Sequence, residues 1–244
     1  MKHSIFSFSS VTSTNDIAKK LLETRNNVIV TAKFQSKGRG RNNKQWVGDE
    51  SKNIYLSIAN EHTTINQEIN LLMLGYQCIG CLAVVISLEK KFLHNNFALK
   101  YPNDVYAQEK DGVFKKISGV LVENEFIGNI IKSSILGIGV NITQSDFAVG
   151  ITATSLYILG LTTNQDELLR QIIFEVNRLL QMPFQELIDC WKLKLNIKNK
   201  SITIIGEEGE WFANEFNDFG MLVVERNGMK ITISNGDSIR YKIE

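Results

Sequence analysis

A short basic loop is the stretch of this sequence best suited to chemistry. From Phe34 to Trp46 the chain runs FQSKGRGRNNKQW and carries four cations and no acid, at Lys37, Arg39, Arg41 and Lys44. Guanidinium groups match the paired oxygens of phosphates and carboxylates. Gly38 and Gly40 leave backbone N–H groups free to approach a ligand, and we expect them to adopt backbone conformations closed to other residues. The loop therefore predicts an anion site, with a solvated basic loop at a strand end as the ordinary alternative.

The composition restricts that anion to a small one. The 244 residues include 27 Lys and Arg against 26 Asp and Glu, which gives a net charge of +1, with 43% hydrophobic and 22% charged residues. This near-neutral composition argues against a general attraction to nucleic acid or to membrane surfaces. The length fits one large domain, or a main domain with a small appendage.

The sequence gives no signal for secretion or membrane insertion. The N-terminal MKHSIFSFSS lacks an apolar core, and the most apolar run, residues 71–86, is shorter than the roughly 20 residues that span a bilayer. The three cysteines are too few for a disulfide framework. The CIGC pair at 78–81 lacks two further ligands, so it is interpreted as buried helix thiols and no metal site is predicted. We expect a cytoplasmic protein without membrane attachment.

Three more segments bring polar side chains to the ends of expected elements. They are STN at 13–15, KYPND at 100–104 and KKISG at 115–119. Taken singly they are an N-cap, a turn and an exposed strand end. The basic loop is not a P-loop because no GK[ST] follows, and Gly137 with Gly139 is not a dinucleotide fingerprint because the third glycine and the helix are missing. That glycine pair is better explained as letting a strand lie close to a ligand.

Alternating helices and strands would position these segments. Apolar spacing predicts a helix that starts at Ser13 or Thr14 and a long helix over 68–91. β-Branched stretches predict strands over 27–34 and 53–59, so the basic loop joins two strands. Three further strands are predicted at FALKYPNDVYAQ, KKISGVLVENEF and KSSILGIGVNIT, and residues 164–195 are predicted as two helices broken near Pro183.

The pattern changes near the C-terminus. From Lys198 onward short alternating stretches are separated by GEEGE, NDFG, RNG and SNGD. This spacing predicts a small antiparallel barrel of about five strands. The segment NIKNK at 196–200 is the expected boundary, which gives domains 1–196 and 197–244. We expect that the second domain could be deleted at 197 without unfolding the first.

In combination, these segments resemble the biotin protein ligases. That family has an early STN, a Q-x-x-GRGR-x-x-R-x-W loop between strands, KWPND, K-x-x-G-x-L and a GIGxN strand, followed by an SH3-like barrel. The corresponding segments here are TSTND, QSKGRGRNNKQW, LKYPNDV, KISGVLVEN and GIGVNIT. The resemblance covers nearly the whole chain. It implies an α/β (α+β) catalytic domain, a mixed sheet with helices, plus a small C-terminal SH3-like β-barrel.

The resemblance also implies a two-step reaction. Biotin and MgATP would give biotinoyl-5'-AMP and pyrophosphate, and a lysine of a biotin carboxyl carrier protein or domain would then attack the mixed anhydride. No covalent enzyme intermediate is needed, which agrees with the lack of a nucleophile and base pair in the sequence. Because two anions must meet, catalysis requires positioning and positive charge. ATP, Mg²⁺ bound to it and biotin are the expected ligands. Many members of the family dimerise through a sheet edge, so a homodimer is one possible state, although one chain does not locate an interface.

The same resemblance assigns roles by position. The biotin head group would be held by Ser13, Thr14, Asn15 and Gln35, with Gly38 and Gly119 also beside biotin. Arg39, Gly40 and Arg41 would form a lid over biotin and the phosphates. Lys116 would contact the biotin carboxylate and the α-phosphate, and together with Arg39 and Arg41 it is predicted to be catalytic. The nucleotide would be bordered by Lys44, Trp46, Asn103, Asp104, Lys116 and Asn141.

Three departures from the family pattern are visible. Lys44 stands where the family often has Arg, which keeps the charge and loses the bidentate fork. Tyr101 replaces the Trp of KWPND, a change that we expect to be tolerated. No helix-turn-helix segment precedes TSTND, so no DNA partner is expected.

Three alternatives stay open at this point. Lipoate or octanoate ligases share the fold and the adenylation chemistry. A regulator could bind biotin without catalysis. A nucleic-acid module could use the basic loop, and its binding would then weaken steeply with salt.

Overall fold

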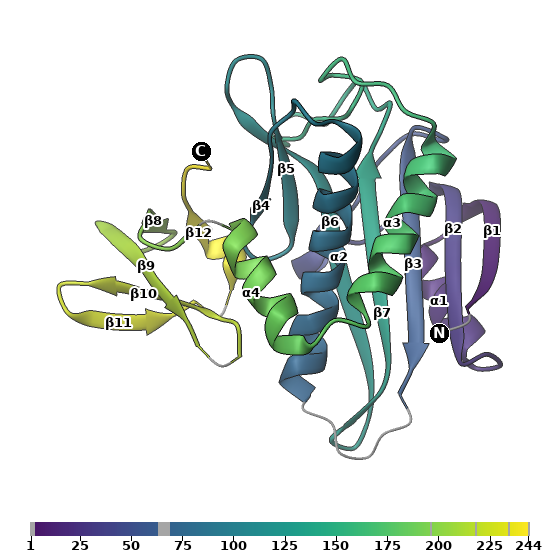
Figure 1. Ribbon diagram of the computed structural model, residues 1–244, viewed down its shortest axis with the longest axis horizontal. Coiled ribbons are helices and arrows are strands. Elements are labelled where there is room, and N and C mark those ends of the chain that lie inside the picture. The colour runs from purple at the N-terminus through teal and green to yellow at the C-terminus, as the bar shows by residue number, and fades with distance from the viewer. Residues whose placement is uncertain (1–2, 63–68, 196, 218, 234, 244) are drawn as a thin grey trace.

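Within the residues that the structure describes, 3–62, 69–195, 197–217, 219–233 and 235–243, two β-sheets and four α-helices form the fold of this computed structural model (Figure 1). The larger sheet has seven strands in the order β1-β2-β3-β7-β6-β5-β4. Only β1 and β2 pair in parallel, so the sheet is mixed, as predicted. The bounds are Ser4–Val11 (β1), Asn27–Gln35 (β2), Asn53–Glu61 (β3), Phe97–Lys100 (β4), Asp104–Gln108 (β5), Phe114–Ile127 (β6) and Ile130–Asn141 (β7).

Helices cover both faces of this sheet. The helices α2 (Ile69–Lys91), α3 (Gln165–Leu179) and α4 (Phe184–Leu195) lie on the near face in Figure 1, and α1 (Thr14–Leu22) lies on the other. The alternation of strand side chains produces this division. On β2, Ile29 belongs to the core under α2, whereas Val28 and Val30 pack with Ala18 of α1. The end of β2, from which the basic loop continues, contacts α1 through Gln35 and Thr14.

Helix α2 is the centre of the main core. It is long and apolar enough over Leu72–Lys91 to cross a membrane, contrary to the shorter run that the sequence suggested, but 67% of that stretch is buried inside the fold. Cys78 and Cys81 are buried in it, as predicted, and burial raises the pKa of both thiols. Gly80 allows the helix to approach the sheet, because a Cβ there would lie 2.7 Å from a methyl group of Val120. We therefore assign α2 as a core helix.

Most of the predicted elements are present, with two differences. The strand β1 was not predicted; its side chains are largely exposed and its pairing with β2 is a long-range contact. The segment FALKYPNDVYAQ is not one strand but a tight hairpin of β4 and β5, in which Lys100 pairs with Asp104. Pro102 has no N–H to donate to a sheet, so it lies in the turn. This turn carries Asn103 to the cavity described below.

The C-terminal residues form a second, antiparallel sheet. Its order is β11-β10-β9-β8-β12, with bounds Ser201–Ile204 (β8), Glu210–Phe216 (β9), Leu222–Arg226 (β10), Met229–Thr232 (β11) and Ile239–Arg240 (β12). The number of strands agrees with the prediction. In the described part of the chain β11 and β12 are the two edges of the sheet and do not pair, so a closed barrel is not confirmed.

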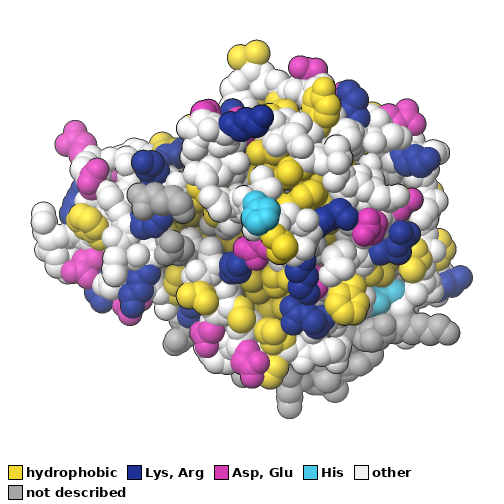
Figure 2. Space-filling view, turned by 45° about the horizontal axis from the view of Figure 1, so that its top comes forward, with side chains coloured by type: hydrophobic (Ala, Val, Ile, Leu, Met, Phe, Trp, Pro, Cys, Tyr) yellow, Lys and Arg dark blue, Asp and Glu magenta, His cyan; other side chains and the backbone are white. Residues whose placement is uncertain are grey.

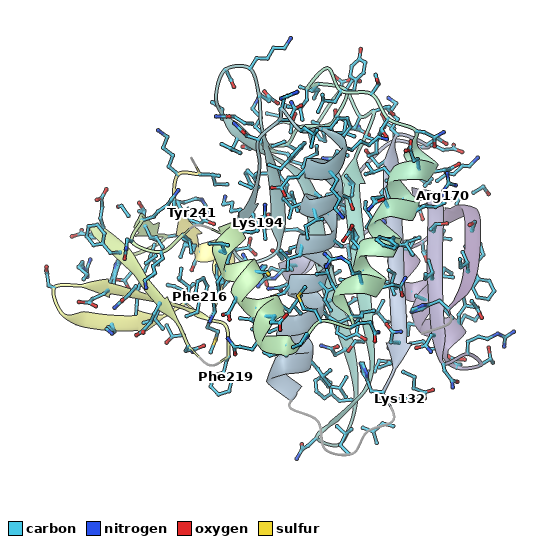
Figure 3. The ribbon with its side chains drawn as sticks, in the orientation of Figure 1. Lys132, Arg170, Lys194, Phe216, Phe219 and Tyr241 are labelled. Carbon is cyan, nitrogen blue, oxygen red and sulfur yellow. The ribbon has the colours of Figure 1, made fainter. Side chains whose placement is uncertain are left out.

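The two sheets meet at an aromatic junction. Trp191 of α4, Tyr101 and Phe216 pack against one another, with ring centroids 5.7 to 6.1 Å apart. The hydroxyl of Tyr241 accepts a 2.7 Å hydrogen bond from the N–H of Tyr101, and Figure 3 shows Phe216 and Tyr241 at this junction. The Tyr101 hydroxyl accepts from Leu222 N–H at 3.3 Å. A Trp side chain, which only donates, could not accept that bond.

Candidate active site

A cavity of about 570 Å³ opens on the face of the sheet that carries α1. Its walls include the start of α1, the basic loop, the turn that leads into β5, residues 116–121 of β6 and residues 137–141 of β7. Every residue that the sequence predicted for the site lines this cavity except Gly38. Segments distant in the sequence therefore converge on one hollow, as the combined pattern required.

Gly38 has a different place. A Cβ at this position would collide with the backbone oxygen of Trp46, whose N–H donates a 2.9 Å hydrogen bond to Gly38 O. Gly40 closes the loop in the same way, because its N–H donates to Lys44 O at 2.7 Å. Neither glycine has a positive φ, contrary to our expectation; in this loop Asn42 does, with φ 52°. Gly38 thus allows the backbone of the loop to approach that of Trp46 closely.

The inner end of the cavity is lined by uncharged hydrogen-bonding groups. Gln35 Oε1 accepts from the N–H of Thr14 at 2.7 Å and from its hydroxyl at 3.0 Å. The hydroxyl of Ser57 lies 2.7 Å from Thr14 Oγ1 and 2.5 Å from Asn15 Oδ1. Ser13 begins α1 but its side chain makes no capping hydrogen bond. Thr14, Asn15 and Gln35 line the cavity as a polar floor and are residues that the resemblance assigned to the head group. Ser57 is fully buried behind them and is a partner that the sequence did not indicate.

Two of the loop cations are held by carboxylates of the chain itself. The fork of Arg39 donates to both oxygens of Asp16, at 2.9 and 2.7 Å, and reaches Glu123 at 3.1 Å. The hydrogen bonds to Asp16 raise the pKa of Arg39 above its ordinary value. Lys44 Nζ lies 3.0 Å from Asp237.

Asp237 is the contribution of the C-terminal sheet to the cavity. It also accepts a 2.5 Å hydrogen bond from Asn42 in the loop. Partial burial acts to raise the pKa of Asp237, but the hydrogen bond from Lys44 and the charges of Lys44 and Arg41 outweigh it, so this pKa lies below 3.8. The residue lies almost 200 positions from the loop in sequence, and no pattern in the sequence pointed to it.

Arg41 and Lys116 carry the positive charge in the middle of the cavity. Arg41 donates to Asn103 Oδ1 at 3.3 Å. Lys116 Nζ lies 2.7 Å from Asp104 Oδ1 and 5.4 Å from the centre of the Trp46 ring. The neighbouring Lys115 is directed away and pairs with Glu109 at 2.7 Å. Consecutive lysines of β6 therefore have different environments, and only Lys116 lines the site.

Trp46 lies over two glycines of the cavity floor. A Cβ on Gly139 would come within 2.5 Å of its indole carbons, and one on Gly119 within 2.9 Å. The indole N–H is buried and makes no hydrogen bond within the described residues. The glycines at 119 and 139 thus make room for a flat ring, and the indole N–H is a donor available to a ligand.

Part of the cavity lining is apolar. Phe147, Ile151 and Ala153 line the cavity from the long connection that follows β7, and Val47 lines it from the basic loop. The sequence analysis did not identify these residues. The only signal was the length of the connection between Asn141 and Gln165, since connections of that length are often functional. Away from the cavity, basic and acidic side chains are intermixed over the surface seen in Figure 2.

Comparison with known proteins identifies the family. The model of the Biotin/lipoate A/B protein ligase family matches residues 7–141, the part of the chain that contains the loop, the polar floor and Lys116. The chain belongs to this family. Among curated relatives, the biotin--[acetyl-CoA-carboxylase] ligase of Mycobacterium tuberculosis is 24% identical over 236 residues, 88% of this chain and 79% of that protein.

Solved structures of ligases in this family have the same fold. The biotin protein ligase of Aquifex aeolicus in complex with biotin and ATP is 26% identical, with a TM-score of 0.74 over 99% of this chain and 100% of that one. The ligase of Leishmania major in complex with biotinyl-5-AMP has a TM-score of 0.64 over 96% of this chain and 100% of that one, at 21% identity. The likeness includes both sheets, since it extends over nearly the whole chain.

Proposed function

We propose that this chain is an ATP-dependent biotin protein ligase. It activates biotin to biotinoyl-5'-AMP and transfers the biotinoyl group to a lysine of a biotin carboxyl carrier domain. The observation that carries this proposal is the composition of the cavity. A floor of neutral hydrogen-bonding groups at Thr14, Asn15 and Gln35 lies in the same hollow as the cations Arg41 and Lys116.

The first step requires positive charge at the place where two anions meet. A carboxylate oxygen of biotin attacks the α-phosphorus of ATP, the bond to the pyrophosphate oxygen breaks, and pyrophosphate leaves. Lys116 is placed to stabilise both the carboxylate and the α-phosphate, and Asp104 holds its ammonium group in the cavity until then. Arg41, on the loop, stabilises the phosphate side, with Asn103 as its support.

The second step needs no side-chain nucleophile of this chain. The ε-amine of the carrier lysine attacks the carbonyl carbon of the mixed anhydride, AMP leaves as its phosphate takes the electron pair, and the amine loses a proton to give the amide. The loop and the apolar part of the lining exclude water from the anhydride until the amine arrives. Trp46, Asn141 and Lys44 border the nucleotide in this arrangement, and Gly119 lies beside biotin.

Magnesium fits this site as a companion of ATP. Within the described residues there is no group of three or more His, Cys, Asp or Glu that could cage a metal, and Mg²⁺ is commonly held by one or two carboxylates together with substrate phosphates. Asp104 and Asp237 are the carboxylates that line the cavity. Bound there with ATP, Mg²⁺ would neutralise phosphate charge.

The polar floor favours biotin over lipoate or octanoate. A site built to hydrogen-bond a substrate rejects an analogue without those groups by a large factor, roughly 10⁴ or more, because its buried polar groups are left unpaired. The ureido ring of biotin has donors and an acceptor for Thr14, Asn15 and Gln35, whereas a dithiolane ring or a methyl end has none. A regulator without catalysis would not need the Lys116 and Asp104 pair in the cavity.

The remaining features of the proposal concern organisation and partners. We propose a catalytic unit over 1–196 and a C-terminal unit over 197–244 related to SH3-like barrels. The near-neutral charge gives no support for DNA as a partner, and the buried α2 favours a water-soluble, cytoplasmic protein. Self-association into a homodimer remains a proposal without a located interface.

The decisive experiment is acceptor modification. The chain is incubated with biotin, MgATP and a biotin carboxyl carrier domain, and the carrier is weighed as an intact protein. A mass gain of one biotinoyl group supports the proposal. Parallel pyrophosphate-release assays with biotin, lipoate and octanoate identify the acid, and activity with lipoate alone would replace biotin in the proposal. Biotin binding without any carrier modification would favour the regulator.

A further inference from the structure

Glu123 of β6 connects the basic loop to the floor of the cavity. Its Oε2 accepts a 2.6 Å hydrogen bond from Asn15 Nδ2, and its two oxygens lie 3.1 and 3.2 Å from Nη2 of Arg39. Asn15 continues the connection, since its Oδ1 lies 2.5 Å from the hydroxyl of Ser57. Ser57 in turn contacts Thr14 at 2.7 Å. One series of polar contacts therefore runs from the loop to the groups proposed for the head group.

The fork of Arg39 is directed at protein carboxylates. Nη1 and Nη2 both bind Asp16, and Nη2 also reaches Glu123. Asp16 lies next to Asn15 in the first turn of α1. The guanidinium thus fixes the N-terminal half of the loop to α1 and to β6 at once. This geometry makes Arg39 an anchor of the loop as well as a residue that lines the cavity.

We propose that Glu123 is a positioning residue of the reaction, which acts through Arg39 on the loop and through Asn15 on the head-group floor. Ordering of the loop and binding of the head group are coupled, because both depend on the same carboxylate. The kinetic part of this inference rests on the proposed function. The clamp itself, Glu123 with Arg39 and Asn15, does not.

The contribution of such a clamp to global stability is small, because Arg39 and Glu123 have side chains 40% and 36% exposed. Its effect on the loop is larger. Surface loops open with free energies far below that of global unfolding, so one ion pair shared by two elements changes the open fraction measurably. The expected consequence is therefore local to the loop.

Trypsin gives a direct measure of loop opening. The loop contains four tryptic sites, at Lys37, Arg39, Arg41 and Lys44. Cleavage after Arg41 and Lys44 is followed by mass spectrometry in wild type and in Glu123→Gln, without any ligand. We expect the variant to be cut about fivefold faster, the change that an ion pair of this exposure supports.

Glu125→Gln is the matched control. Glu125 lies two positions further along the same strand and on the same face, where it pairs with Lys19 at 3.0 Å and with Ser133 at 2.8 Å. It does not touch the loop in the described structure. We expect its loop cleavage to equal that of wild type. Equal rates for Glu123→Gln and wild type, or equal acceleration in both variants, would overturn the proposal.

Two further measurements separate positioning from a general structural role. In an Arg39→Met background, Glu123→Gln should not accelerate cleavage further, since the two residues act together. In the biotin-activation assay, Glu123→Gln should raise the KM for biotin about tenfold and lower kcat much less, because the ordering cost falls on binding. Additive cleavage effects, or a loss of kcat with unchanged KM, contradict the mechanism. If Glu123→Gln does not fold by circular dichroism, Asp16→Asn provides the cleavage test from the other carboxylate that binds Arg39.

The outcomes distinguish this inference from the proposed function. If loop cleavage depends on Glu123 but the protein has no ligase activity, the clamp is supported and the proposed function is refuted. If the protein has ligase activity but loop cleavage is the same in the Glu123 and Asp16 variants as in wild type, the function is supported and the clamp is refuted.

Discussion

Two glycines lie on one face of β7, and replacing each by alanine should affect a different substrate. Gly137 and Gly139 are two positions apart on the same strand and both line the cavity. An alanine Cβ at Gly137 would lie 2.5 Å from Asn15 Oδ1, whereas one at Gly139 would lie 2.5, 2.7 and 2.8 Å from three indole atoms of Trp46. The first contact is in the proposed head-group pocket and the second is at the proposed nucleotide border.

The size of the effect follows from these distances. Non-bonded carbon atoms rest at about 3.5 Å, so the indole must retreat by about 1 Å to admit the new methyl group. Inserting a methylene into a packed site costs about 1–3 kcal/mol, which corresponds to roughly a 5- to 150-fold change in affinity. Asn15 cannot retreat without disturbing its 2.6 Å bond to Glu123. We therefore expect Gly137→Ala to raise the KM for biotin, and Gly139→Ala to raise the KM for ATP, each within that range.

Pyrophosphate release, measured while either biotin or ATP is varied, provides the test. Each variant serves as the control for the other, because both add one methyl group to the same strand. Thermal denaturation checks that both remain folded. If the two variants change the same KM, or if Gly139→Ala leaves the KM for ATP unchanged, Trp46 does not border the nucleotide and the division of the cavity is wrong.

Four other predictions test separate parts of the structure. Lys116→Met should slow adenylate formation about 100-fold, roughly 3 kcal/mol, as for loss of one preorganised donor, while Lys115→Met should have little effect; equal effects would remove Lys116 from the site. Arg41→Gly should make biotinoyl-AMP but release it, so that a streptavidin blot shows unrelated proteins labelled more than with wild type at equal adenylate production; unchanged labelling would refute the lid. Burial acts to raise the pKa of the fully buried Glu175, but hydrogen bonds from Lys90 and Arg178 outweigh it and hold this pKa below 4.5, so its stabilising effect is complete above about pH 4.5 and is lost as the pH falls through the lowered pKa. The difference in Tm between wild type and Glu175→Gln should accordingly shrink on acidification, and a constant difference from pH 7 to 3 would contradict this. Deletion of residues 197–244 should lower the Tm and slow adenylation, because it uncovers Trp191 and removes Asp237 from the loop. The sequence predicted instead that the C-terminal unit is separable, and full activity of the truncated protein would support that prediction.

The sequence predicted those helices and strands in which apolar side chains recur with the spacing of a helix or a strand. The strands β2 and β3 and the helix α2 agree with the prediction to within two residues at each end. The strand β1 was missed because its largely exposed side chains carry little pattern, and its assignment depends on parallel pairing with β2. KYPND was identified as a turn when taken singly, but the stretch around it was still predicted as one strand, so the hairpin of β4 and β5 was missed.

Most residues that line the cavity were named through the family resemblance, but several of their hydrogen-bond partners were not. Asn15, Gln35 and Lys116 stand at positions fixed by the family pattern. Asn15 binds Ser57 and Glu123, which come from other elements and which the sequence did not indicate, whereas Lys116 binds Asp104, which was already predicted for the site. Which side chains meet is decided by strand register. A one-residue slip of β6 would turn Glu123 to the opposite face of the sheet.

The ion pairs observed in the fold change the interpretation of the basic loop. In the sequence, the four cations of the loop were interpreted together as a site for an anion. In the fold, Arg39 is matched by Asp16 and Glu123, and Lys44 by Asp237, so two of the cations anchor the ends of the loop. Arg41 lies between these anchors with an amide oxygen as its partner. Because carboxylates hold the loop on both sides of Arg41, little further ordering is needed for this guanidinium to contact a ligand in the cavity that Lys116 also lines.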